Sequence, residues 1–389
     1  MTQLNDELMR KHAVSSLGLN PFPWYKHMRM TAPVSIDEQN QLCELFCYKD
    51  VQAVLVDPLL FSSKGRFSGE EEEGDRGGIA VMDPPRHDKL RALVSQAFTP
   101  RTIAQQADNI RSIVNELLDA SSTSNTLDVI RDLAIPLPMR VITGLMGIPL
   151  SRQADFRRWV QEAMGYSQEQ GVAGFQACEN YMRELIMQKR KVRQDDLVSA
   201  LLDAQIDEEP LPEQEMVDFC VGLLGAGIDP TRHLIGNIIL CLDEHLSARE
   251  QVWADPSLVS STIEEVLRFR PVGHRLVRLA TRDTEIGGKQ IKAGYRIFAW
   301  TGSANRDEEK WRDPEVFDIR RSPNPHLDFG YGIHACLGAQ LARLQARIAL
   351  EQIIERFKDL QRVREVALEL VPSLLFHGLQ QLPIHVQKR

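Results

Sequence analysis

The chain lacks the features that mark disulfide-rich, zinc-binding or membrane-spanning proteins. Its 389 residues include only six cysteines, with no C-x-x-C pair and no histidine cluster at zinc-ligand spacing. No stretch approaches the roughly 18 consecutive apolar residues that a membrane helix needs, and the first residues are polar. Scattered thiols suit a reducing compartment. The sequence therefore predicts a cytoplasmic protein without a membrane anchor.

Internal repeats and excess basic charge are also missing. Without a repeat, a solenoid is excluded, and a formal net charge of -8 argues against a nucleic-acid-binding surface. That charge leaves room for a local basic patch facing an acidic protein partner. The content of 43% hydrophobic residues is enough for a sizeable core. We expect one domain, 1–389, because the motifs described below are spread over the chain and would serve one site.

Helical periodicity fills most of the chain, whereas strand-like stretches are short. These stretches cover 42–48, 284–286 and 296–300, and Gly287-Gly288 predicts a hairpin turn after the second of them. The sequence predicts a mainly α fold with small β-sheets. Glycines and repelling carboxylates over 68–78 predict a mobile, solvated surface loop.

Cys336 is the residue that says most about chemistry. It lies in the run F-G-Y-G-I-H-A-C-L-G at 329–338, and an apolar stripe of helical spacing follows it at Leu337, Leu341, Leu344 and Ile348. A helix start directly after the cysteine would lower the thiol pKa and favour the thiolate that binds metals. The alternative for a lone cysteine is a small buried apolar side chain. The surrounding glycines and histidine favour a ligand.

This run resembles the heme loop of the cytochrome P450 family, F-G-x-G-x-H-x-C-x-G. Every fixed position is matched, by Phe329, Gly330, Gly332, His334, Cys336 and Gly338. The resemblance implies the cytochrome P450 fold, with heme b held between a long central distal helix and the cysteine loop. It also implies that Cys336 is the thiolate ligand of the iron, with Phe329, His334 and Gly338 beside the cofactor.

A long apolar helix is predicted over 213–244. Its buried stripe consists of Leu224, Ile228, Thr231, Ile235 and Ile238. The helix is similar to the distal helix of the family, whose signature is A-G-x-[D/E]-T-T. Ala226, Gly227, Asp229 and Thr231 match this signature, and Pro230 replaces its first threonine. Proline in a helix interior typically costs about 3 kcal/mol, so its presence here points to function.

Pro230 removes the alcohol that, by resemblance, helps to deliver protons at the distal side. Three replacements are open: Thr231 moved into register, a water or substrate hydroxyl acting with Asp229, or hydrogen peroxide as the oxygen source. We favour water or substrate assistance, with Asp229 as the relay acid. The alternative for Asp229 is a buried carboxylate in a salt bridge.

Two further motifs resemble cofactor-binding and scaffold elements of the family. His87 and Arg91, four apart on one helical face, match an H-x-x-x-R pair that binds heme propionates, and Arg278 and His334 resemble the other propionate contacts. The pair of Glu265 and Arg268 matches the E-x-x-R scaffold element.

Val316 departs from the arginine that often completes the ion cluster of this scaffold element. The third member of the cluster is therefore open.

The resemblance implies a monooxygenase that oxidises a small organic substrate with dioxygen. Electrons would come from a ferredoxin or flavodoxin, because the chain shows no flavin- or nicotinamide-binding appendage. A docking face behind Cys336 would include Arg101, Arg343 and Arg347, which equally suit a solvated helix face. A peroxide-driven enzyme and a non-catalytic heme sensor are the rival interpretations.

By resemblance, six residues line the substrate cavity: Ile79, Leu224, Val272, His274, Arg275 and Phe376. The set is mainly apolar. His274 and Arg275 either reach a polar or anionic substrate group or turn toward the propionates or the surface. The sequence leaves both open.

Overall fold

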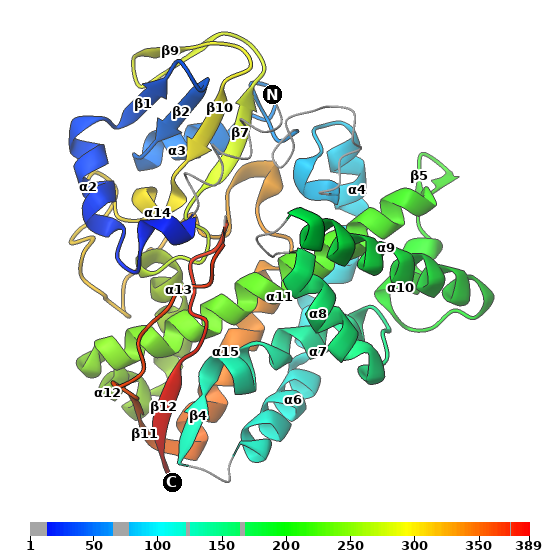
Figure 1. Cartoon of the computed structure of the whole chain (residues 1–389), viewed down its shortest axis with the longest axis vertical. Coiled ribbons are helices and arrows are strands. Elements are labelled where there is room, and N and C mark those ends of the chain that lie inside the picture. The colour runs from blue at the N-terminus through cyan, green and yellow to red at the C-terminus, as the bar shows by residue number, and fades with distance from the viewer. Residues whose placement is uncertain (1–13, 65–77, 122–124, 164–167, 374) are drawn as a thin grey trace.

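The structure, a computed structural model, describes residues 14–64, 78–121, 125–163, 168–373 and 375–389. It is mainly helical with small sheets, as predicted (Figure 1). The helices are α2 Phe22–Thr31, α3 Tyr48–Val56, α4 Arg86–Ser95, α5 Pro100–Ala104, α6 Ala107–Ala120, α7 Pro136–Leu145, α8 Gln153–Ala163, α9 Gln168–Lys191, α10 Leu197–Leu202, α11 Glu213–Glu244, α12 Leu246–Ala254, α13 Val259–Phe269, α14 Thr301–Ala304 and α15 Ala339–Arg356.

The largest sheet has the order β1-β2-β10-β7-β3. Its strands are β1 Val34–Asp37, β2 Leu42–Leu45, β3 Phe61–Ser62, β7 Leu276–Ala280 and β10 Arg296–Ala299. Only the β2–β10 pairing is parallel. Ile297, Phe298 and Ala299 are all buried, as expected of a strand covered on both faces. The sheet joins the amino-terminal segment to the chain that precedes the cysteine loop (Figure 1).

The smaller sheets differ in position, and the hairpin over 284–291 shares a hydrophobic cluster with the largest sheet. β11 Phe357–Arg362, β12 Pro383–Lys388 and β4 Thr126–Asp128 form one of them, at the end of the molecule that holds the carboxyl terminus (Figure 1). Two hairpins complete the β-structure: β5 Gln205–Ile206 with β6 Glu209–Pro210, and β8 Thr284–Ile286 with β9 Lys289–Ile291.

Two of the predicted strands end earlier than expected. The stretch 42–48 stops at Leu45, and α3 begins at Tyr48, whose N–H donates to the Asp307 carboxylate at 2.7 Å. This tertiary contact lies at the start of α3, where the chain has left the sheet. The stretch 296–300 ends at Ala299. The strand 284–286 and its hairpin are confirmed, with Gly287 and Gly288 at φ 56° and 76° in the left-handed region that such turns require.

The central helix α11 has the predicted bounds and crosses the middle of the molecule (Figure 1). It contacts α7, α9, α13 and α15. All five residues of its predicted apolar stripe are buried. Burying each leucine or isoleucine contributes roughly 1.5–3 kcal/mol, so packing holds α11 as one helix despite Pro230.

The helix after the cysteine starts later than predicted. α15 begins at Ala339, because Cys336 to Gly338 form a turn in which the Ala339 N–H reaches the Cys336 carbonyl at 3.4 Å. Leu337 therefore precedes the helix. Leu341, Leu344 and Ile348 of the predicted stripe are buried.

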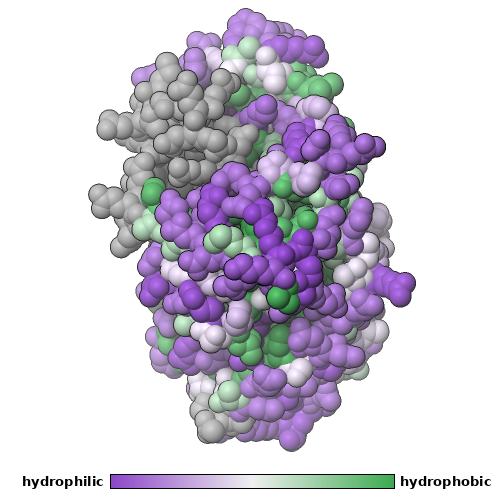
Figure 2. Space-filling model, turned by 90° about the vertical axis from the view of Figure 1, so that its right-hand side faces the viewer, coloured by the Kyte–Doolittle hydropathy of each residue, from purple (hydrophilic) through white to green (hydrophobic). Residues whose placement is uncertain are grey.

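The surface and the thiols complete the description. Hydrophilic side chains dominate the face drawn in Figure 2, and hydrophobic ones appear there in small groups. None of the described helices is long and apolar enough to cross a membrane. All six cysteines are described, and all are free thiols. The predicted loop 68–78 lies outside the described residues except for Gly78, which begins a short 3-10 helix, Gly78–Val81.

Candidate functional site

The loop that carries Cys336 folds back on itself. The Cys336 N–H donates to the Phe329 carbonyl at 2.8 Å, and the Ala335 N–H donates to the Gly332 carbonyl at 3.1 Å. Gly330 and Gly332 have φ of 70° and 72°, and a Cβ on Gly332 would come within 2.3 Å of the Leu55 carbonyl oxygen. The backbone thus fixes the direction of the Cys336 side chain, which is exposed and free to bind a ligand.

The electrostatics of the thiol differ from the sequence prediction. Burial by surrounding protein atoms raises the pKa of Cys336, and the Gly338 N–H and the Arg91 guanidinium oppose this only in part. The expected helix start directly after the cysteine is not found, because α15 begins three residues later. A bound metal cation would reverse this balance, since a coordinating thiol is deprotonated outright.

His87, Arg91 and His334 come together beside the cysteine loop. The His87 side chain is 1% exposed, and its ring lies 4.3 Å from that of His334. His87 Nδ1 is 2.9 Å from the Asp88 carboxylate, whereas the buried Nε2 has no hydrogen-bond partner among the described residues. Arg91 Nη2 donates to the Ala335 carbonyl at 2.5 Å. These groups suit an anionic partner next to Cys336.

Arg278, the remaining expected propionate contact, comes from a different element. It lies on β7, opposite Ile297 of β10, and is buried. Its Nη1 donates to the Val277 carbonyl at 2.8 Å.

On the other side, α11 presents an open stretch in the middle of a buried helix. Ala226 is exposed, although Leu224 and Ile228 near it are buried. Pro230 has no N–H, so the Ala226 carbonyl lacks its usual helical donor. The Thr231 hydroxyl donates to the Gly227 carbonyl at 3.1 Å. That hydroxyl is thus already engaged inside the helix.

Asp229 is held by its own helix. One carboxylate oxygen lies 3.0 Å from Arg232 Nε, and the other lies 3.5 Å from Nε2 of the buried His233. Burial raises the pKa of Asp229, but His233 and Arg232 outweigh it and bring the pKa below its ordinary value. This is the salt-bridged arrangement that the sequence left open. Arg232 and His233 were not among the predicted site residues, although their spacing of three and four residues from Asp229 was a signal.

Four of the expected substrate residues are apolar and lie near the central helix. Leu224 and Val272 belong to the main hydrophobic core, and Ile79 and Phe376 pack against it. Gly273 and Phe376 form an isolated β-bridge, which brings 272–276 beside the segment that follows Ser373. These four residues, from separate parts of the chain, thus belong to or pack against one hydrophobic core.

His274 and Arg275 do not follow either expectation from the sequence. His274 is fully buried, with Nδ1 at 2.8 Å from the Tyr25 hydroxyl and Nε2 at 3.1 Å from the Pro271 carbonyl. The Arg275 guanidinium lies 4.2 Å from the centre of the Phe298 ring and is also buried. Both side chains pack into the aromatic cluster under the sheet, which commits them to the scaffold.

The residues present fit a flat cofactor with a metal and anionic substituents. Cys336 and Ala226 are both exposed although the core surrounds them, and a Cβ on Gly338 would meet no atom within 4 Å. The buried Nε2 of His87 lacks a partner among the described residues. A thiol, open space and unused polar hydrogen-bonding capacity thus occur at one place.

The family model described as Cytochrome P450 matches residues 139–375. A putative cytochrome P450, YjiB of Bacillus subtilis (strain 168), is 40% identical over 376 residues, which cover 94% of this chain and 93% of that protein. The chain belongs to the cytochrome P450 family. A further relative, the cyclomarin C epoxidase CymV of Salinispora arenicola (strain CNS-205), is 36% identical over 351 residues, which cover 87% of this chain and 89% of that protein.

Solved structures agree with this assignment. The crystal structure of CYP109E1 from Bacillus megaterium with corticosterone has a TM-score of 0.87 and 37% identity, with 94% of this chain and 98% of that chain covered. The cytochrome P450 fold expected from the sequence is therefore confirmed. As a cytochrome P450, the protein is a heme-thiolate monooxygenase that uses heme b, acts on an organic substrate and takes electrons from a redox partner.

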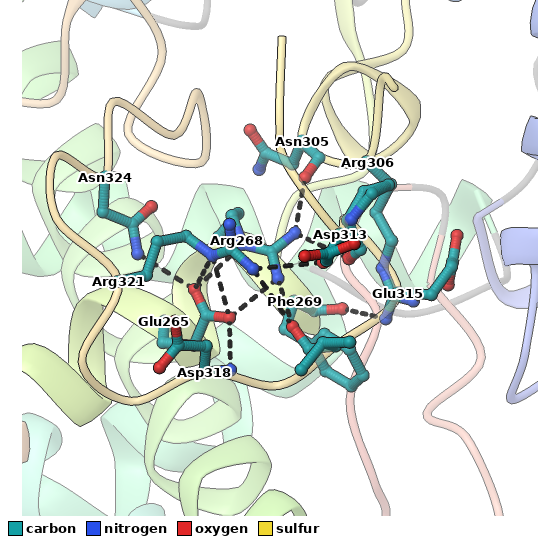
Figure 3. A network of polar contacts seen from close by, with 12 residues as sticks. Glu265, Arg268, Phe269, Asn305, Arg306, Asp313, Glu315, Asp318, Arg321 and Asn324 are labelled. Carbon is teal, nitrogen blue, oxygen red and sulfur yellow. Dashed lines mark hydrogen bonds and ion pairs between the residues drawn. The ribbon is translucent and has the colours of Figure 1, made fainter. Parts of the chain in front are cut away.

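The scaffold pair of this P450 is a buried ion cluster (Figure 3). Arg268 Nη2 and Nε donate to the Glu265 carboxylate at 2.7 and 2.9 Å, and both side chains are 0% exposed. Arg321 Nε, 3.3 Å from the same carboxylate, is the third member that the sequence analysis did not find. Val316 still contributes through its backbone, because its carbonyl accepts from Arg268 at 3.0 Å.

Proposed function

We propose that Cys336 would supply the thiolate ligand of the heme iron in this P450. His87, Arg91, Arg278 and His334 bind the propionates, and the other cofactor contacts are made by Phe329, Gly338 and, from α11, Ala226. The observation that carries the proposal is the exposed Cys336 thiol in a closed loop, one residue from the carbonyl that holds Arg91. The chain acts as a single domain in this proposal, since all these residues serve one heme.

The reaction inserts one atom of dioxygen into the substrate, as a hydroxyl or an epoxide, and reduces the other atom to water with two electrons and two protons. Bound heme supplies the oxygen-activating chemistry. The substrate is a small, largely apolar organic molecule of the secondary-metabolite or steroid kind. Two things support this class: the apolar group formed by Ile79, Leu224, Val272 and Phe376, and the corticosterone and cyclomarin C named for the relatives.

A ferredoxin or flavodoxin is the proposed electron donor, and it docks on the face behind Cys336. Arg101 is exposed there. Arg343 forms a two-pronged ion pair with Glu264 at 2.7 and 2.8 Å, and Arg347 lies 3.9 Å from Glu351. The contribution of Arg343 is thus partly neutralised. Six free thiols support the cytoplasm as the proposed location.

For the distal side we infer proton delivery by Asp229 with a water molecule or a substrate hydroxyl. The Thr231 hydroxyl donates inside the helix, so it is poorly available for this role. The Ala226 carbonyl, which lacks its helical donor at Pro230, offers an acceptor for a water molecule. To deliver a proton, the Asp229 carboxylate must loosen from Arg232 and His233.

The experiment that tests the function is a ligand screen followed by turnover. Compounds that shift the heme Soret band are incubated with dioxygen and a surrogate ferredoxin system, or with hydrogen peroxide alone, and the products are analysed. We expect oxygenated product with dioxygen and the electron supply. Product with peroxide only would instead favour a peroxide-driven enzyme, which Pro230 makes the second candidate.

Pro230→Thr is expected to raise the fraction of consumed electrons that appears in product. The substitution restores a backbone N–H and places a hydroxyl where the family signature has one. The measurement is the ratio of product formed to electrons consumed. Thr231→Val serves as the matched control, since it removes a hydroxyl that is engaged inside the helix. An unchanged ratio in Pro230→Thr would show that the proline is not mechanistically important.

Asp229→Asn is expected to lower the dioxygen-dependent rate by about 10²-fold or more, the usual range for loss of a general acid. The peroxide-supported rate falls less, because peroxide already carries the protons. Asp243→Asn is the matched control, as Asp243 is a buried carboxylate on the same helix that pairs with Arg364 at 3.0 Å. Equal losses in both variants and both assays would assign Asp229 a purely structural role.

A further inference from the structure

Asp328 joins two separate segments of the chain. One carboxylate oxygen accepts the Gly273 N–H at 3.0 Å, and the other accepts the Val272 N–H at 3.1 Å. No lysine or arginine of the described chain lies within ion-pair distance of it. The carboxylate therefore acts as a clip that holds two consecutive backbone amides, and the neighbouring His326 imidazole favours its charged form.

On one side, the clip leads to the cysteine loop within one residue. Asp328 directly precedes Phe329, whose carbonyl accepts the Cys336 N–H at 2.8 Å. The Asp328 N–H donates to His326 Nδ1 at 3.3 Å, and His326 Nε2 lies 3.1 Å from Glu264. Asp328 is thus adjacent to the backbone that fixes the direction of the Cys336 side chain.

On the other side, the clip holds the segment 271–276 next to the proposed substrate group. The Val272 carbonyl accepts the His377 N–H at 2.8 Å, and the Gly273 carbonyl accepts the Thr301 hydroxyl at 2.9 Å. These contacts hold the carbonyls, whereas the amides depend on Asp328. Val272 is one of the proposed substrate-lining residues. A ligand that displaces Val272 therefore also disturbs its hydrogen bond to Asp328.

We propose that Asp328 is a positioning residue for the monooxygenase reaction, which ties the substrate-lining segment 271–276 to the cysteine loop and lowers the heme reduction potential by its charge. This inference rests on Cys336 as the heme ligand, and it does not depend on the distal proton path. A nearby negative charge stabilises the more positive oxidised iron, so its removal favours reduction.

The test compares Asp328→Asn and Asp328→Glu with the wild type in the heme-loaded enzyme. Burial raises the pKa of Asp328 to about 6, so the carboxylate is ionised at pH 8. In Asp328→Asn we expect amide hydrogen exchange over 271–276 to quicken by roughly tenfold or more, because one amide loses a charged acceptor. The midpoint potential moves to more positive values. Asp328→Glu keeps the charge and hence the potential, while exchange over 271–276 still quickens.

Coupling is measured with 4-phenylimidazole, which binds heme iron and fills the space beside it. In the wild type the probe slows exchange in both 271–276 and 327–338, whereas in Asp328→Asn the two segments no longer respond together. Asp307→Asn is the matched control. Asp307 is also a buried carboxylate on two backbone amides, those of Tyr48 and Glu309 at 2.7 and 3.0 Å. We expect it to leave the potential and the exchange of 271–276 unchanged.

Wild-type exchange over 271–276 in Asp328→Asn, or a potential equal to that of Asp307→Asn, would overturn the proposal. Failure of both Asp328 variants to load heme, when Asp307→Asn loads it, would also overturn it in favour of a role in folding alone. An error in the ligand assignment shows itself separately. Cys336→Ser would then keep the thiolate Soret band, whatever the Asp328 variants do.

Discussion

Cys336→Ser is expected to abolish the red-shifted Soret band of the reduced, carbon monoxide-bound enzyme and to reduce monooxygenase turnover below detection. A serine hydroxyl is a much weaker anionic ligand than a thiolate, and it cannot push electron density onto the iron as sulfur does. The fold should persist, because the loop is closed by backbone hydrogen bonds from Cys336 and Ala335 that serine keeps. The measurements are the Soret spectrum, the heme content and the product yield.

Cys220→Ser is the matched control for this change. Cys220 lies on α11, is fully buried, and has its pKa raised to about 12 by burial, so it is an inert apolar side chain. We expect this variant to keep the thiolate Soret band and turnover. A thiolate band that survives in Cys336→Ser would refute the ligand assignment.

Glu265→Gln is expected to destabilise the enzyme by about 3 to 5 kcal/mol, the usual cost of leaving one charge of a buried pair uncompensated. The Glu265 carboxylate also accepts the Asp318 N–H at 2.8 Å and the Asn324 amide at 3.1 Å. Its loss therefore frees the segment after α14 that holds Asp318 and Asn324, as well as Arg268 (Figure 3). Urea unfolding of the heme-loaded enzyme, followed by circular dichroism and the Soret band, measures the change.

Arg158→Ala is the control for this stability measurement. Arg158 pairs with Glu162 on α8 at 3.9 Å, but its side chain is 62% exposed. An exposed helix pair of this kind contributes about 0.3–0.5 kcal/mol at most, so little change is expected. If Glu265→Gln costs no more than this control, the cluster is not a scaffold element.

The sequence-based predictions that the structure confirmed were based on patterns within a single element. The bounds of α11 and the β8–β9 hairpin depend on patterns within one element, namely an apolar stripe and two consecutive glycines. The start of α15 was misplaced, because the turn after Cys336 is closed by a contact that no periodicity encodes. The end of the strand predicted over 42–48 was wrong for the same reason, because the Tyr48 N–H donates to the distant Asp307 carboxylate.

The same distinction between local patterns and tertiary contacts applies to the predicted site residues. His87, Arg91 and His334 come together from two segments, and their binding of propionates stays a prediction. His274 and Arg275 were expected by resemblance to line the substrate cavity or to turn toward the propionates or the surface, and the sequence does not show which neighbours surround them. The structure packs them against Tyr25 and Phe298. Residue type alone had suggested a polar substrate contact.

The sequence by itself determined the family, the cofactor and the mainly helical fold, because the heme loop and the distal signature are compact motifs read within a few residues. Only the tertiary structure decided the partners of charged groups. Arg321 replaces the expected third member of the ion cluster, and Asp328 meets Val272 and Gly273 across more than fifty residues. These contacts join segments that are distant in the sequence. They form when the segments pack, because a buried charge without a partner is costly.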